Sequence, residues 1–180
     1  MSVSKVLKMI KDKEVKFVDL RFTDTKGKWQ HTAQTSTTID ENTFKEGIMF
    51  DGSSIAGWKN INESDMILMP DSSTAVMDPF TAQPQLILFC DVIEPTDGKP
   101  YELDPRSTGK KAENYLKTSG IGEKCFFGPE AEFFIFDDVK WATNQEYTFF
   151  SIDSEEGAYN TGSEMEGGNM GHRPKDKGGY

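Results

Sequence analysis

Apolar residues recur at regular spacings through the first forty positions of the chain. In residues 3–10 they fall at i, i+3, i+4 and i+7, which predicts a short amphipathic helix capped by Ser2. In residues 15–23 they alternate with polar residues, which predicts a half-buried strand. A turn at 24–27 and a β-branched stretch at 29–38 follow, so the strand is expected to continue into a hairpin.

Further elements are expected up to residue 100. Asp40 is placed to cap a short helix that runs to Glu46 and ends at Gly47. The strand candidates are residues 66–69, 74–77 and 85–92. Together these elements predict an α+β unit, with a mixed sheet and one or two short helices.

A second section is predicted to begin with Asp104 as a helix cap and Pro105 in the first turn. The helix is expected to reach about Thr118 and to close at Gly120. We therefore place a domain boundary after residue 103, which gives domains 1–103 and 104–180.

Downstream of this helix, residues 125–139 predict one long strand, because the run is rich in phenylalanine and other apolar residues. Residues 143–180 are rich in glycine and show no periodicity, so irregular loops are expected there. The chain is expected to stop before a closing element.

The net charge of the chain disfavours two classes of binding partner. The formal net charge is -10, and an acidic chain repels nucleic acid and anionic membrane surfaces, so neither is expected as a partner. Lysines interrupt every apolar stretch near the N-terminus, and no apolar run approaches membrane-spanning length, so a cytoplasmic protein is expected. Cys90 and Cys125 lie in apolar runs and are expected to be buried free thiols, with a single bridge between them left open.

Glu130 and Glu132 are candidate metal ligands. Side chains two residues apart in a strand point to the same face, so these carboxylates would lie side by side among phenylalanines. A divalent cation would relieve their repulsion, and oxygen ligands favour Mg²⁺ or Mn²⁺ over zinc. The alternative is that both glutamates lie on a solvent-exposed face.

The segment Asp51-Gly52-Ser53-Ser54 is a second candidate site. Its glycine permits close approach of the backbone to another group, and Asp51 can accept a proton or bind a cation. The alternative is an Asx-turn in which Ser54 caps a short helix. His31, on the predicted hairpin, is expected to be a surface residue.

Three segments taken together resemble type I glutamine synthetases. Residues 50–58, with 61–66 after them, resemble that family's N-terminal loop. Residues 127–134 resemble its first metal-ligand strand, and 166–174 with 178–180 resemble its next block. Each motif is modest alone, but they occur in order along essentially the whole chain.

The resemblance implies roles for individual residues. Glu132 would bind the metal ion nearer glutamate, and Glu130 the one nearer the ATP phosphates. Asp51 would act across a subunit interface by binding ammonium and taking its proton, with Ser54 beside it. Tyr180 would lie near the ammonium pocket. Trp58 is expected at the subunit contact near the nucleotide.

The resemblance also implies an architecture and a reaction. Residues 1–103 would form a β-grasp-like domain, and residues 104–180 would begin a catalytic domain. The family assembles as two stacked hexameric rings, and it joins L-glutamate and ammonia with ATP and two Mg²⁺ or Mn²⁺ ions through a γ-glutamyl phosphate. The family's remaining metal and substrate ligands are expected beyond residue 180, so the 180-residue chain alone is expected to be inactive.

Three other functions stay open at this stage. A relative that uses an amine instead of ammonia is disfavoured by the presence of Asp51. A non-catalytic module that associates with itself or with full-length subunits is a second alternative. A simple acidic domain that binds Mg²⁺ or Mn²⁺ without ATP is a third.

Overall fold

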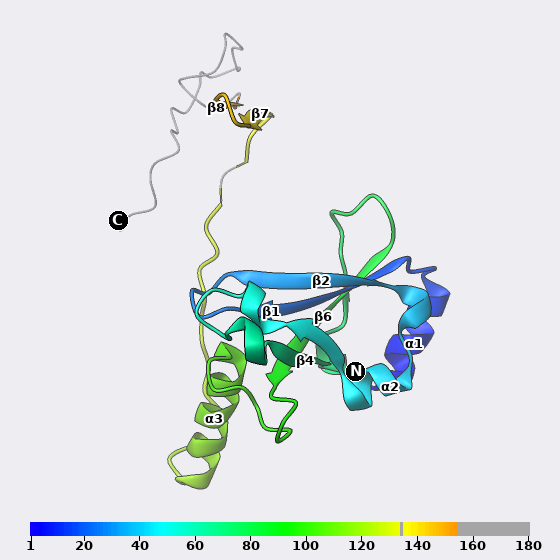
Figure 1. Cartoon of the computed structure of the whole chain (residues 1–180), viewed down its shortest axis with the longest axis vertical. Helices are drawn as coiled ribbons and strands as arrows, with labels where there is room; N and C mark the ends of the chain where they lie inside the picture. Colours follow the sequence, from blue (N-terminus) through cyan, green and yellow to red (C-terminus); the bar gives the residue numbers. More distant parts are fainter. Residues whose placement is uncertain (134, 155–180) are drawn as a thin grey trace. The chain divides into compact units, whose positions relative to one another are not determined.

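A computed structural model describes residues 1–133 and 135–154 (Figure 1). Contacts between residues divide the chain into two units, Met1–Cys125 and Phe126–Tyr180. No helix of the described residues is both long enough and apolar enough to span a membrane.

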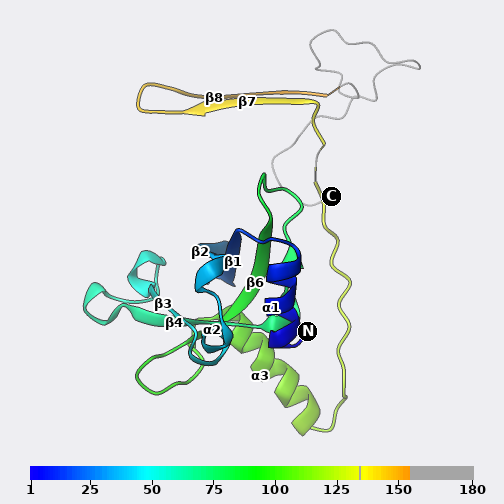
Figure 2. The same cartoon turned by 90° about the vertical axis from the view of Figure 1, so that its right-hand side faces the viewer.

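The first unit is built on a mixed sheet with the order β2-β1-β6-β4-β3, and β5 pairs additionally with β6. Only β1 and β6 run parallel, and the other neighbours are antiparallel. Figure 2 shows β6 passing through the middle of this unit. The strands are β1 (Phe17–Thr23), β2 (Trp29–Thr35), β3 (Ile48–Asp51), β4 (Asp65–Pro70), β5 (Val76–Met77) and β6 (Gln85–Ile93).

Three α-helices and four short 3₁₀ helices complete the first unit. The α-helices are α1 (Val3–Asp12), α2 (Glu41–Glu46) and α3 (Pro105–Thr118). The 3₁₀ helices are η1 (Ser36–Thr38), η2 (Gly52–Ser54), η3 (Ile61–Glu63) and η4 (Ser72–Thr74). All three α-helices and the strands expected in the first hundred residues are confirmed, and β3 is an addition.

One face of the sheet carries the core. Alternate residues of the central strands, among them Leu20, Leu68 and Leu88, are fully buried together with Val6 of α1. This alternation is the period of two that the sequence showed. Burial of such side chains stabilises the fold by about 1.5–3 kcal/mol each.

Two helices begin as their sequences predict. At α2, the Thr43 amide donates to Asp40 Oδ1 at 3.0 Å and the Asp40 amide donates to Thr43 Oγ1 at 3.1 Å, which is a reciprocal capping box. At α1, Ser2 holds the cap position, but its hydroxyl contacts Ser4 Oγ at 3.0 Å and makes no capping bond.

Asp104 caps α3 and also ties it to the sheet. It accepts from the Arg106 and Ser107 amides at 3.0 and 3.2 Å and from the Ser107 hydroxyl at 2.8 Å. Its Oδ2 also accepts from the amide of Val92 in β6 at 3.3 Å, and the residue is fully buried. The first helix after the sheet is therefore joined to β6. The boundary we placed after residue 103 stays a prediction.

The second unit contains an antiparallel hairpin, β7 (Asp138–Thr143) and β8 (Thr148–Asp153). The long strand predicted over 125–139 is wrong: regular strand structure begins only at Asp138. A strand needs a neighbour to satisfy its backbone groups, and in the described part of the chain no strand pairs with residues 125–133. The glycine-rich residues 155–180 lie outside the described residues.

One further expectation about burial is corrected. Cys125 is exposed, because the apolar segment it opens is itself exposed, whereas Cys90 is buried as predicted. Burial is the main cause that raises the pKa of the Cys90 thiol far above its ordinary value, so this thiol stays protonated. Trp58 is 8% exposed and packs against Phe22 and Tyr101 within its own unit, and its place at a subunit contact stays a prediction.

Candidate functional site

Asp51 stands at the exposed end of β3, an edge strand paired with β4. The Asp51 Oδ1 atom accepts two hydrogen bonds from Ser53, from its amide at 2.8 Å and from its hydroxyl at 2.7 Å. This is an Asx-turn, as the alternative to a functional site predicted, but the cap of the short helix is Asp51 and not Ser54. The turn leaves the carboxylate exposed, and a functional role for Asp51 stays a prediction.

Hydrogen bonds set the charge of this carboxylate. The Ser53 hydroxyl and then the Ser53 amide hold the pKa of Asp51 below its ordinary value, and the hydroxyl of Ser64 adds to this effect. Asp51 is therefore ionised at neutral pH. An exposed, ionised carboxylate attracts a cation and can accept a proton from it.

Gly52 fixes the turn against the neighbouring strand. Its amide donates to the Ser64 carbonyl oxygen at 2.7 Å. A Cβ atom at Gly52 would lie 2.6 Å from Met66 Cγ and 3.1 Å from the Ser64 oxygen, closer than side chains tolerate. Only glycine lets the backbone between Asp51 and Ser53 approach β4 this closely.

Ser54 ends η2 and is exposed, and the hydroxyl that contacts Asp51 belongs to Ser53. The sequence prediction named Ser54 and missed Ser53. The signal was present, because an aspartate followed two residues later by serine is the spacing of this turn. The role proposed for Ser54 stays a prediction.

A lysine–glutamate pair lies beside the turn. Lys59 Nζ donates to Glu94 Oε1, and the two side chains are about four-fifths buried. This hydrogen bond raises the pKa of Lys59, which therefore remains charged. An open hollow of about 610 Å³ adjoins the pair, between the η3–β4 segment and the residues that follow β6.

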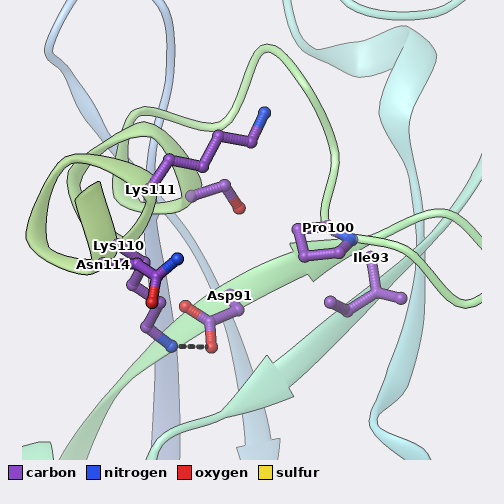
Figure 3. Close-up of a pocket in the computed structure, with 7 residues that line it drawn as sticks. Asp91, Ile93, Pro100, Lys110, Lys111 and Asn114 are labelled. Carbon is purple, nitrogen blue, oxygen red and sulfur yellow. Dashed lines mark hydrogen bonds and ion pairs between the residues drawn. The ribbon is translucent and has the colours of Figure 1, made fainter. Parts of the chain in front are cut away.

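A second hollow, of about 270 Å³, lies between β6 and α3 (Figure 3). Asp91 faces it from β6, while Lys110, Lys111 and Asn114 face it from α3. Lys110 Nζ donates to Asp91 Oδ2, so this pair closes one side of the hollow. None of the residues predicted as site residues lines it.

Glu130 and Glu132 lie in the second unit, in a segment without regular secondary structure, and both are exposed. The strand geometry that was to align them is absent. Their oxygens suit Mg²⁺ or Mn²⁺ in kind, but among the described residues no group of three potential metal ligands occurs. The two glutamates therefore fit as contributors to a metal site and not as a whole one. Tyr180 lies outside the described residues.

The mixed sheet and its flanking helices define an α+β protein, with a β-grasp domain within its first unit. Family models agree: that of the glutamine synthetase beta-Grasp domain matches residues 14–95, and that of the glutamine synthetase catalytic domain matches residues 102–180. The chain belongs to the glutamine synthetase family.

Two curated relatives are similar to this chain over almost its whole length. The chain is 60% identical, over all 180 residues, to a glutamine synthetase of Methylococcus capsulatus. It is 56% identical over 179 residues to a 3-hydroxylaminophenol mutase of Cupriavidus pinatubonensis, which covers 99% of the chain. The chain spans 38% of the length of each of these relatives.

A solved glutamine synthetase of Plasmodium falciparum shares the fold. The match covers 90% of this chain and 31% of that structure's chain, with a TM-score of 0.65 and 24% sequence identity. Similarity at this level concerns the fold alone.

Proposed function

We propose that this chain supplies part of the active site of an enzyme that joins L-glutamate and ammonia to L-glutamine with ATP, through a γ-glutamyl phosphate. The observation that carries the proposal is the 60% identity, over the whole chain, to a protein named glutamine synthetase. The two family models, matched in order, support it.

Asp51 is the residue of the described chain to which we assign chemistry. Its ionised carboxylate binds ammonium by charge and then accepts a proton, which converts ammonium to the nucleophile ammonia. The Ser53 hydrogen bonds keep the carboxylate charged before ammonium arrives. Ser54 would contribute a second hydroxyl at the same loop, and Tyr180 would lie near the ammonium.

Glu130 and Glu132 would contribute one carboxylate each to the binding of Mg²⁺ or Mn²⁺. When bound, the metal ions would neutralise negative charge on the ATP phosphates. Further ligands are required, because two exposed carboxylates make a weak site. We also propose assembly into two stacked hexameric rings, in which Asp51 acts on the site of a neighbouring subunit. The cytoplasmic location expected from the sequence remains a prediction.

A hybrid enzyme tests the proposal. This chain would replace the matching residues of the Methylococcus capsulatus glutamine synthetase, and ADP release would be measured with and without glutamate and ammonium. We expect release that depends on both substrates. An assembled hybrid that releases no ADP would contradict the proposal, provided that the unaltered relative is active under the same conditions.

The same hybrid separates ammonia from amines as the second substrate. Asp51 is present in this chain, and its presence disfavours a relative that uses an amine, so we expect ammonium to be preferred to methylamine. A preference for methylamine would support a glutamate–amine ligase instead.

Association without catalysis is a second candidate, and one observation favours it. Several large apolar side chains of the second unit are between 71% and 88% exposed, an exposure typical of surfaces that pack against other protein. These are Phe126, Phe127, Phe133, Ile135, Trp141 and Phe150. Size measurements of the chain, alone and mixed with a full-length relative, would detect such association.

A further inference from the structure

We propose that Ser53 is a positioning residue for Asp51: it holds one oxygen of the Asp51 carboxylate, so that the other oxygen is presented to ammonium. The inference rests on the proposed function. It assigns a role to the serine next to the one that the sequence indicated, and it follows from the contacts at the end of β3.

Two hydrogen bonds from one residue fix the orientation of the carboxylate. The Ser53 amide and hydroxyl both donate to Oδ1, at 2.8 and 2.7 Å. A carboxylate held at one oxygen by two donors of a rigid turn loses rotational freedom about its terminal bond. Oδ2 is not used by Ser53, and Asp51 is an exposed residue.

The backbone that carries Ser53 is itself fixed. Gly52 is buried, and its amide donates to the Ser64 carbonyl oxygen at 2.7 Å. Ile55, which follows η2, is 7% exposed in the core. Ser53 therefore sits between two anchored residues, which is the support that a positioning group requires.

Three charged residues lie in the segments next to Asp51. Asp65 lies opposite Asp51 in the β3–β4 register. Glu63 lies in η3, just before Ser64. Lys59 follows η2, but its ammonium group is engaged by Glu94. The Ser53 hydroxyl and amide lower the pKa of Asp51 more than any other group does, so these hydrogen bonds are the main stabilisers of the Asp51 charge.

A second turn in the same unit supplies a matched control. Asp71 Oδ1 accepts from the Ser73 amide at 2.9 Å and from the Ser73 hydroxyl at 2.6 Å. Ser73→Ala thus removes the same kind of hydroxyl from the same kind of turn, away from Asp51.

The first test titrates the Asp51 carboxyl group by carbon NMR in the 180-residue chain. We expect Ser53→Ala to raise the pKa of Asp51, Ser53→Thr to restore it through its hydroxyl, and Ser73→Ala to leave it unchanged. An Asp51 titration that is the same in Ser53→Ala and in the unaltered chain would overturn the proposal, and this test needs no activity.

The second test uses the hybrid enzyme. We expect Ser53→Ala to raise the KM for ammonium roughly fivefold, the effect of one hydrogen bond to a charged group at an exposed site, and to move the acid limb of kcat/KM to higher pH. Ser53→Thr should recover both, and Ser73→Ala should match the parent. Equal effects of Ser53→Ala and Ser73→Ala would mean that the hydroxyl acts only on stability. A parent hybrid without activity contradicts the proposed function, while the NMR titration still decides the role of Ser53.

Discussion

Asp51 and Asp71 adopt the same turn, each accepting an amide and a hydroxyl hydrogen bond from the serine two residues further on. They differ in the groups that contact the other carboxylate oxygen. Arg106 donates to Asp71 Oδ2 and also to Asp91 Oδ1, so Asp71 is part of an ion network between α3 and the sheet. Asp51 is exposed at the end of an edge strand. The turn at residue 71 therefore contributes to the stability of the fold, whereas the turn of the same kind at residue 51 leaves its carboxylate available for chemistry.

Replacing Asp51 by asparagine should remove the ammonium-dependent activity of the hybrid enzyme. The amide is neutral and cannot accept the proton, so we expect kcat/KM for ammonium to fall by about 10²–10⁴. Initial rates at varied ammonium would measure it. Because Asp51 is exposed, the unfolding midpoint should change little. A rate within a few-fold of the parent would remove Asp51 from the chemistry.

Replacing Gly52 by alanine should destabilise the first unit by about 1–3 kcal/mol, because its Cβ would meet Met66 and the Ser64 carbonyl. Urea unfolding would measure the change. Gly109→Ala in α3 is the control, since nothing lies within 4 Å of its Cβ and alanine favours helices by about 0.5–1 kcal/mol. If both variants were stabilised, the close approach at Gly52 would be wrong.

Acid should weaken the fold in part through Asp71. Burial raises the pKa of this carboxyl, but hydrogen bonds from Ser73 and the charges of Arg106 and Lys110 outweigh it, so the pKa lies below the ordinary value of 3.8. The stabilising contribution is complete above that value and is lost as the pH falls through the lower folded-state pKa.

Asp71→Asn should therefore lower stability at neutral pH and flatten its decline below about pH 4. Urea unfolding of both proteins between neutral pH and acid would show it. Parallel curves for the two proteins would show that Asp71 makes no pH-dependent contribution.

The metal-binding proposal predicts a contrast between the chain and the hybrid. Two exposed carboxylates should give the 180-residue chain only weak Mn²⁺ binding, measurable by calorimetry or spin resonance. In the hybrid, Glu130→Gln and Glu132→Gln should each weaken Mn²⁺ binding at least tenfold. Glu146→Gln, in the turn between β7 and β8, is the control and should have no effect. Tight binding by the chain alone would instead favour a metal-binding domain that works without ATP.

The sequence predicted well those elements whose signals are local. Asp40 and Asp104 are caps whose side chains reach amides two or three residues away, and the alternation in residues 15–23 reports burial directly. Its failures involve partners distant in sequence. Residues 125–139 carry the composition of a strand, but a strand also requires a neighbour to pair with.

Site prediction followed the same division. Asp51 was singled out because a carboxylate beside glycine and serine is a local pattern, and its role stays a prediction. Ser53 was missed, because which of two adjacent serines turns back to Asp51 depends on the packing of Gly52 against β4.

The position of β6 has a consequence for biosynthesis. It pairs with both β1 and β4, yet it is the last strand of its sheet to be synthesised. Until residues 85–93 leave the ribosome, the nascent chain holds two separate hairpins, β1–β2 and β3–β4, and an isolated hairpin is marginally stable in water. β6 is the strand that connects these two pairs, so the complete sheet forms only after β6 is synthesised. Before β6 is synthesised, a chaperone that binds exposed strand edges would be able to bind the nascent chain.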